Sequence, residues 1–361
     1  MNRVKTWLLS VFVLLSIATL VVAQERNEIA FPDIEGYSTL KCDLHTHTVF
    51  SDGNVWPTVR VDEAYRVGLD VLALSDHIEY QPHKADVPTN HNRPFEVALG
   101  RARELGIILI RGAEITRDTP PGHFNVIFLK DINPLVKDDL VEAIAAGCEQ
   151  GGFVFWNHHA WKGEELGRWL DIHSTLYEKK LLHGMEVANG DDYYPTAHRW
   201  CLEKGLTMVG NSDIHGPDLL QKNTSAEHRT MTLVFVTEKS EQGVLEALRA
   251  GRTAVWCGPL MIGKPEWLTA LAEASLEIDP PHMRSKTSVW VKVRNKCAMD
   301  LVLKRTGQFG PAEVTLKANT TAIFRINVPD ASQPIPLEYE ITNFLAAPGE
   351  GLDVSYTIPA P

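Results

Sequence analysis

The stretch Thr39-Leu-Lys-Cys-Asp-Leu-His-Thr-His47 joins a short apolar run to two histidines that lie two residues apart. On an extended strand alternate side chains share a face, so His45 and His47 would point the same way. Two imidazoles on one face suit a divalent metal ion. We therefore expect the first strand of the fold to end in metal ligands.

Outward from this strand, apolar runs alternate with amphipathic stretches as far as about residue 255. The apolar runs are residues 39–44, 70–74, 107–110, 124–129, 153–156, 185–188, 207–209 and 231–236. The helix-like stretches between them are residues 57–67, 94–105, 135–150, 163–180, 195–204 and 242–250. This alternation predicts an α/β fold with a parallel sheet, and seven or eight repeats favour a closed or nearly closed, TIM-like barrel.

The chain changes character after the barrel-like region, which we place at residues 24–257. Residues 258–280 are expected to be a linker. Short, partly alternating runs punctuated by Gly, Pro and Asn fill residues 281–361. They predict a small all-β, sandwich-like C-terminal domain.

The first 23 residues are typical of a secretory signal peptide. Arg3 and Lys5 precede an apolar run over residues 7–22, and Ala23 ends a small-residue cleavage site. We expect this segment to be removed and the protein to be secreted, to the periplasm if the source is a Gram-negative bacterium. A retained membrane anchor is the alternative, and the run is short for one.

Charge argues against a nucleic-acid partner. The chain carries 35 Lys and Arg against 46 Asp and Glu, a net charge of −11. Proteins that bind phosphate backbones are normally basic. The five cysteines are widely spaced and form neither a disulfide framework nor a C-x-x-C zinc motif.

Further metal-ligand types recur where apolar runs meet loops. They are Asp52, His77, Glu114, His123, His158, Asp213 and His215. In parallel α/β folds, active sites assemble at that edge of the sheet. A single histidine there is usually an ordinary polar residue, but this recurrence predicts a polynuclear metal site.

Taken in order, these motifs resemble those of the PHP (polymerase and histidinol phosphatase) superfamily over residues 39–255. The resemblance implies a distorted (β/α)7 barrel. The signal segment, residues 76–80, residues 227–230 and the β-rich tail look most like secreted phosphodiesterases that act on organophosphate diesters.

The resemblance also implies a trinuclear centre of Mn, Fe or Zn. The first ion would be held by His45, His47, Glu114 and Asp213; the second by Glu114 as a bridge, with His123 and His158; the third by Asp52, His77 and His215. Asp52 stands where other members have histidine, which shifts the preference weakly from Zn toward Mn or Fe. Three divalent ions exceed the charge of three carboxylates, so the site should attract an anion.

The activity implied is a metal-dependent phosphoric diester hydrolase in which metal-bound hydroxide attacks a small phosphate ester. Glu114 and Asp213 would serve catalysis as metal ligands, and Arg229 would clamp the phosphate unless it forms a surface salt bridge. Substrate contacts are expected from Tyr80, His83 and Lys162, although loop exposure alone explains each equally well. Asp76 would orient His77, or cap a helix.

Other interpretations stay open. Trp161, Tyr193, Tyr194 and Trp200 form either an apolar wall for an organic group or part of the core. A phosphomonoesterase of the histidinol-phosphatase type is the alternative enzyme, and a non-catalytic binding protein is the alternative outside enzymes. The oligomeric state and the natural substrate are not predicted.

Overall fold

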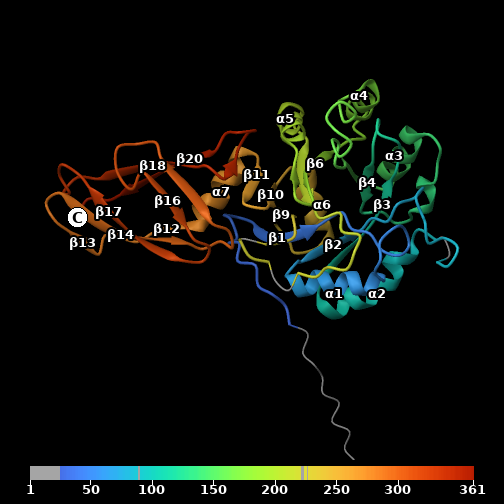
Figure 1. Ribbon diagram of the computed structural model, residues 1–361, viewed down its shortest axis with the longest axis horizontal. Helices are drawn as coiled ribbons and strands as arrows, with labels where there is room; N and C mark the ends of the chain where they lie inside the picture. The colour runs from blue at the N-terminus through green and yellow to red at the C-terminus, as the bar shows by residue number, and fades with distance from the viewer. Residues whose placement is uncertain (1–24, 88–89, 221–222, 226) are drawn as a thin grey trace, which may run out of the picture.

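The computed structural model describes residues 25–87, 90–220, 223–225 and 227–361. The predicted signal segment at residues 1–23 lies outside these ranges. A larger α/β part and a smaller β-rich part follow one another along the long axis of the molecule (Figure 1). Within the described ranges, no helix is both long enough and apolar enough to cross a bilayer.

The sheet begins with three parallel strands, as the sequence predicts. They are β1 (Ser38–Asp43), β2 (Val71–Leu74) and β3 (Ile108–Ile115). The connections are α1 (Pro57–Val67) and α2 (Arg93–Leu105), each with a proline in its first turn. Proline suits that position because its missing N–H would have no partner inside the helix.

The expectation of an all-parallel sheet is wrong. The next strand, β4 (Phe124–Ile127), runs antiparallel to β3 and to β5 (Phe153–Trp156). Only residues 116–123 connect β3 to β4, which is too short for the crossover that a parallel neighbour needs. Beyond them, β6 (Gly184–Asn189) pairs parallel with β5 and β8 (Thr207–Asn211), whereas β9 (Met231–Val236) is antiparallel to β1 and β10 (Thr253–Cys257).

This mixed sheet curls so that β8 returns toward β9 and β10. Side chains make the connection there: Thr232 Oγ1 donates to the Gly210 carbonyl, and Thr253 Oγ1 donates to the Met208 carbonyl. A Cβ at Gly210 would lie 2.1 Å from Val255 Cγ1, so only glycine permits this approach. The α/β class is confirmed, whereas closure into a (β/α)7 barrel stays a prediction.

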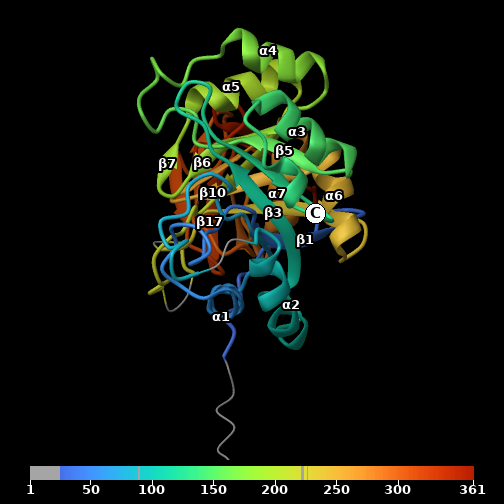
Figure 2. The same cartoon turned by 90° about the vertical axis from the view of Figure 1, so that its right-hand side faces the viewer.

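The remaining helices pack outside the curled sheet, with α4 (Asp171–Glu178) and α5 (Pro195–Lys204) opposite α1 and α2 (Figure 2). The expected helix over residues 135–150 splits into a 3-10 turn (Asn133–Leu135) and α3 (Leu140–Glu149), which begins where the Asp139 side chain accepts the Glu142 N–H. Residues 163–170 contain a short turn and irregular chain rather than helix. The last helix of this part is α6 (Glu241–Arg249), and the short strand β7 (Asp192–Tyr193) pairs with β6.

The prediction of a linker over residues 258–280 is also wrong. This segment folds into β11 (Leu260–Gly263), α7 (Pro265–Ser275) and β12 (Leu276–Ile278). Gly258 and Pro259 form the β10–β11 turn, and Pro265 lies in the first turn of α7. At the far side of β11, the C-terminal part contributes β19 (Phe344–Leu345) as a parallel edge strand.

Two antiparallel sheets build the C-terminal part, which confirms the predicted β domain. One contains β12, β13 (Met283–Arg284), β14 (Ser288–Asn295) and β17 (Thr321–Asn327). The other contains β15 (Leu301–Arg305), β16 (Glu313–Leu316), β18 (Ile335–Ile341) and β20 (Leu352–Ile358). Buried and exposed residues alternate along β18, as expected for a sheet with one face in a core.

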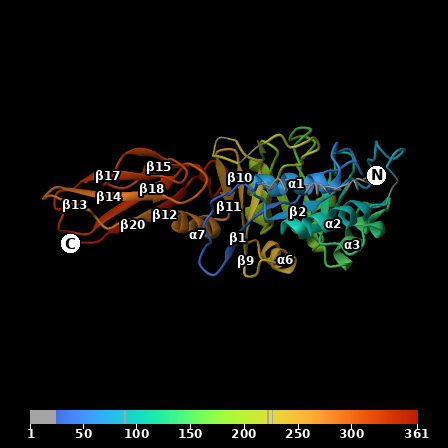
Figure 3. The same cartoon turned by 90° about the horizontal axis from the view of Figure 1, so that it is seen from below.

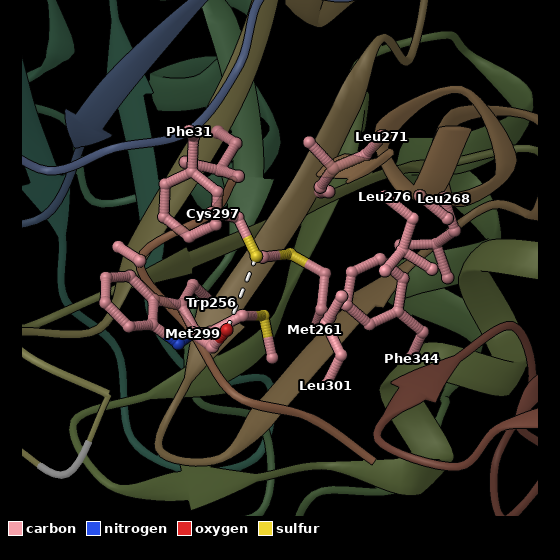
Figure 4. Close-up of a cluster of buried hydrophobic side chains, with 14 of the residues drawn as sticks. Phe31, Trp256, Met261, Leu268, Leu271, Leu276, Cys297, Met299, Leu301 and Phe344 are labelled. Carbon is pink, nitrogen blue, oxygen red and sulfur yellow. Dashed lines mark hydrogen bonds between the residues drawn. The ribbon is translucent and has the colours of Figure 1, made fainter. Parts of the chain in front are cut away.

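One hydrophobic core spans both parts. Phe31 packs edge-on against Trp256 at 5.0 Å between ring centroids, and residues of α7 and of the C-terminal strands surround them (Figure 4). Seen from below, the C-terminal strands extend from the end of the sheet at β10 and β11 (Figure 3). The β domain is therefore packed onto the α/β part rather than tethered to it.

Candidate metal centre

The two histidines that follow β1 meet two carboxylates at the rim of the sheet. His45 Nε2 lies 3.0 Å from Glu114 Oε2 and 3.1 Å from Asp213 Oδ1. His47 Nε2 lies 3.2 Å and 2.9 Å from the same two oxygens. Both imidazoles are fully buried, so the i, i+2 spacing places them on one face as predicted.

Short backbone bridges beyond the strand ends fix these side chains. His77, which follows β2, forms a parallel bridge with Glu114 in β3, and the Asp213 N–H donates to the His45 carbonyl. His123 precedes β4, so in an all-parallel sheet it would lie at the opposite edge. Because β4 is antiparallel, His123 comes to the same rim, beside the residues that follow β5.

Glu114 lies at the centre of the cluster and is close to five of its histidines. Its Oε2 lies 3.2 Å from His77 Nδ1 as well as close to His45 and His47. The other oxygen, Oε1, lies 2.7 Å from His123 Nδ1 and 3.7 Å from His158 Nε2. A carboxylate with both oxygens among different imidazoles is placed to bridge two cations.

A second group lies around Asp52. Its Oδ2 is 3.2 Å from His215 Nε2 and 3.6 Å from His77 Nε2, and its Oδ1 is 3.7 Å from His47 Nδ1. The adjoining Gly53 permits this arrangement, because a Cβ there would lie 2.7 Å from the His47 backbone.

The residues fit a cluster of divalent ions. His158 Nδ1 is buried without a hydrogen-bond partner, and Asp213 and His158 both have positive φ, 53° and 20°. Such strain is typical of functional sites. The structure brings three sets of donor atoms within 4.8 Å of one another: His47, Asp52, His77 and His215; His45, His47, Glu114 and Asp213; and His77, Glu114 and His123. His158 is in none of these sets, so the number of ions stays a prediction.

The histidines and carboxylates of the cluster shift one another's pKa values. Burial lowers the pKa of His47, but hydrogen bonds to Asp213 and Glu114 outweigh burial and raise this pKa to about 10. Burial likewise raises the pKa of Glu114, yet the neighbouring His77 and His45 hold it well below its ordinary value. The carboxylates are thus ionised at neutral pH and compensated by positive charge, a role that metal ions can take.

Glu186 is a supporting residue that the sequence argument missed. It is fully buried on β6, and its Oε1 accepts from His45 Nδ1 at 2.9 Å and from Asn211 Nδ2 at 2.9 Å. Its Oε2 accepts from the His158 N–H at 2.8 Å and from Asn189 Nδ2 at 2.9 Å. The sequence did contain a sign of this role, because Glu186 is a carboxylate within the apolar run 185–188.

Asp76 does not orient His77. Its carboxylate accepts from the Thr48 N–H at 2.7 Å and from Ser51 Oγ at 2.9 Å, so it holds the loop that carries Asp52. His77 Nδ1 instead lies 2.6 Å from Thr116 Oγ1. The expected role of Asp76 is corrected accordingly.

Arg229 is not placed to clamp a phosphate. Its guanidinium is buried, with Nη1 3.2 Å from Asp43 Oδ2 and Nη2 bonded to Asp218. Burial lowers the pKa of Arg229, but Asp43 and Asp218 outweigh it and raise that pKa above its ordinary value. Arg229 therefore joins two carboxylates behind the cluster, and we withdraw the predicted substrate contact.

A cavity of about 960 Å³ opens over the cluster. Tyr80 and Lys162 line it as predicted, whereas His83 is not among its lining residues. Of the aromatic residues with two interpretations, Trp161 and Tyr194 line the cavity, and Trp200 stacks on the core residue Trp156. Further wall residues that the sequence argument missed are Glu79, Thr116, Arg117, Asp118, Lys137, Asp138, Asn189 and Asp192.

Comparison with solved structures gives the family. A structure from Bacteroides vulgatus, described as a two-domain protein containing a predicted PHP-like metal-dependent phosphoesterase, is 45% identical with a TM-score of 0.88. The match covers 93% of this chain and 99% of that one. The chain belongs to the PHP-like metal-dependent phosphoesterases. The superfamily resemblance of its metal-ligand motifs is thereby confirmed.

Other matches of this PHP-like chain cover a smaller part of its length. A family model described as an Ig-like domain matches residues 276–357. A 5'-3' exoribonuclease from Haemophilus influenzae is 42% identical over 78 residues, 22% of this chain and 24% of the relative, so the match spans about a quarter of that protein. An amidohydrolase structure from Chromobacterium violaceum is 17% identical with a TM-score of 0.38, covering 49% of this chain and 88% of that one.

Proposed function

We propose that this PHP-like phosphoesterase is a secreted hydrolase of small phosphodiesters that works with three divalent ions. The observation that carries the proposal is the position of Glu114, whose two oxygens face different imidazoles, among them His77 and His123, which line a large cavity. That arrangement supports adjacent cations at the place where a phosphate would enter.

We assign the ligand sets as the family resemblance implies, and the donor group around His45, His47, Glu114 and Asp213 supports the first of them. The first ion would be held by His45, His47, Glu114 and Asp213; the second by Glu114 with His123 and His158; the third by Asp52, His77 and His215. When bound, such ions neutralise phosphate charge and lower the pKa of water. The chain itself fixes the ligands: Glu186 anchors His45, and Thr116 bonds to His77.

The walls of the cavity favour a diester over a monoester. Outside the cluster they carry four carboxylates, Glu79, Asp118, Asp138 and Asp192, against three cations, Arg117, Lys137 and Lys162. Arg117 is bonded to Glu79 and to the Lys137 and Asp138 carbonyls, so its donors are already used. A monoester dianion would gain little from these walls, whereas a diester carries less charge and a second organic group to fill the space.

The short match to an exoribonuclease agrees with diester chemistry, because RNA linkages are phosphodiesters. The net acidic walls do not suit a long polyanion. A small diester therefore fits the cavity better than an RNA strand.

The test compares bis(p-nitrophenyl) phosphate with p-nitrophenyl phosphate, which share one leaving group. The mature chain is loaded with Mn²⁺, and we expect kcat/KM for the diester to be the larger. Preference for the monoester would favour the histidinol-phosphatase type of activity. Absence of turnover on both would leave a binding protein.

Metal content and secretion need separate measurements. Elemental analysis of the Mn-loaded protein should approach three equivalents per chain, and one equivalent with full activity would contradict the trinuclear site. N-terminal sequencing of exported protein should begin at Gln24. An intact N-terminus on the exported protein would contradict cleavage.

A further inference from the structure

We propose that Trp161 forms a stacking subsite for a flat aromatic or heteroaromatic ring carried by the substrate; this rests on the proposed function. The indole lines the cavity and is 51% exposed. Its ring centroid lies 5.8 Å from that of His123 and 5.9 Å from that of His158. A group esterified to a phosphate at the cluster would reach it within a few bonds.

The exposed position of Trp161 is held by the local backbone. The Trp161 N–H donates to the His158 carbonyl at 3.0 Å, and the Gly163 N–H donates to the Ala160 carbonyl at 2.7 Å. Lys162 Nζ lies 4.5 Å from the indole centroid, so one face is engaged within the chain. The exposed half of the side chain is the part available to a ligand.

The other tryptophans of this region show what a structural role requires. Trp156 is 1% exposed, stacks on Trp200 at 5.9 Å, and meets Trp169 edge-on at 6.0 Å. Trp161 does not pack with these tryptophans, although it lies between Trp156 and Trp169 in the chain. Its exposure is therefore explained by a ligand rather than by core packing.

Tyr80 provides a second exposed aromatic wall. Its side chain is 54% exposed, lines the same cavity, and lies 5.9 Å from the His77 ring. Aromatic side chains favour flat ligands because stacked or edge-on rings gain energy beyond simple burial. The mixed charges of the surrounding wall suit a neutral ring better than a further phosphate.

Binding of non-hydrolysable phosphonates tests the subsite without a leaving-group effect. The Mn-loaded full chain is titrated with phenylphosphonate and methylphosphonate, followed by intrinsic fluorescence and by competition with the chromogenic diester. We expect phenylphosphonate to bind about 10-fold more tightly, as for one aromatic stack. Trp161→Ala should remove most of that preference, and Trp161→Phe should retain part of it.

Leu166→Ala is the matched control, because Leu166 is exposed in the same connection but does not line the cavity. A second pair, adenosine 5'-monophosphate against ribose 5-phosphate, separates a ring carried on a sugar from one carried directly on the phosphate. A ring preference in either pair that depends on Trp161 supports the subsite.

Equal binding of ring-bearing and ring-free ligands, or a ring preference unchanged in Trp161→Ala, would overturn it. Because binding is measured directly, a wild-type protein that binds phenylphosphonate but hydrolyses no diester would contradict only the proposed function.

Discussion

Replacement of Glu186 by glutamine tests whether the metal cluster depends on residues behind it. The carboxylate accepts four hydrogen bonds of 2.8–2.9 Å in a fully buried position. Glutamine keeps one acceptor oxygen and presents an NH₂ group to the donors on the other side. Two buried donors thus lose their acceptor, at about 1–3 kcal/mol each, so unfolding should become easier by about 2–6 kcal/mol.

The effect on metal binding should be separate from the loss of stability. If the glutamine NH₂ group faces His45, the His45 ring loses the acceptor that orients it. If the NH₂ group faces His158, the His158 backbone N–H loses its acceptor. Loss of such a partner typically weakens metal affinity by about 10- to 100-fold. We would measure Mn²⁺ affinity by chelator competition at a temperature where the Glu186→Gln variant is folded, and unfolding by urea.

Glu277→Gln is the control, since Glu277 lies in the C-terminal part and is half exposed beside Lys296. It should leave both quantities close to those of the wild type. A Glu186→Gln protein with unchanged Mn²⁺ affinity and unchanged unfolding would refute the reasoning.

Four further predictions follow from the structure. Glu114→Gln should lower diester turnover by at least about 100-fold and reduce the bound metal, and near-normal kinetics and metal content would remove it from the centre. Arg229→Ala should destabilise the fold by about 3–5 kcal/mol, because Asp43 and Asp218 are left buried without their cation; a stable variant with a selective loss of diester rate would instead restore the phosphate clamp. Burial lowers the pKa of His173 from 6.5 to about 4, so its contribution to stability is present above pH 6.5 and is lost as the pH falls toward 4; His173→Gln should flatten the melting temperature across that range, and an unchanged slope would contradict this. Phe344→Asp should lower the melting temperature of the whole chain in one transition, whereas an unaffected α/β transition in calorimetry would show that the two parts unfold independently.

Local patterns predicted the metal cluster because strand geometry alone determines much of it. The i, i+2 spacing of His45 and His47 requires only that β1 be extended. The acidic residue of the Glu114 motif was found for the same reason, as it lies near the end of an apolar run. The sequence also separated the β-rich C-terminal part by its short alternating runs.

Long-range partners explain what the sequence did not reveal. Arg229 meets Asp43, 186 positions away, so nothing near it in the chain indicated that its charge is already compensated. His123 was predicted to lie at the rim of a parallel sheet, where a residue that precedes its strand would lie at the opposite edge. It reaches the rim because β4 runs antiparallel. Residues 258–280 were expected to be a linker, but β11 finds its partners in β10 and in β19, and the latter lies about 80 residues further along the chain.

The edge strand β19 bears on how the protein is made. Met261 and Ile262 in β11 pair with Phe344 and Leu345, so the α/β sheet gains its last strand only after about 80 further residues have been synthesised. Until then β11 presents an unpaired edge, the kind of surface that invites association with other chains. A nascent polypeptide stalled before Phe344 would therefore be a natural substrate for chaperones, even though every proposed metal ligand had already left the ribosome.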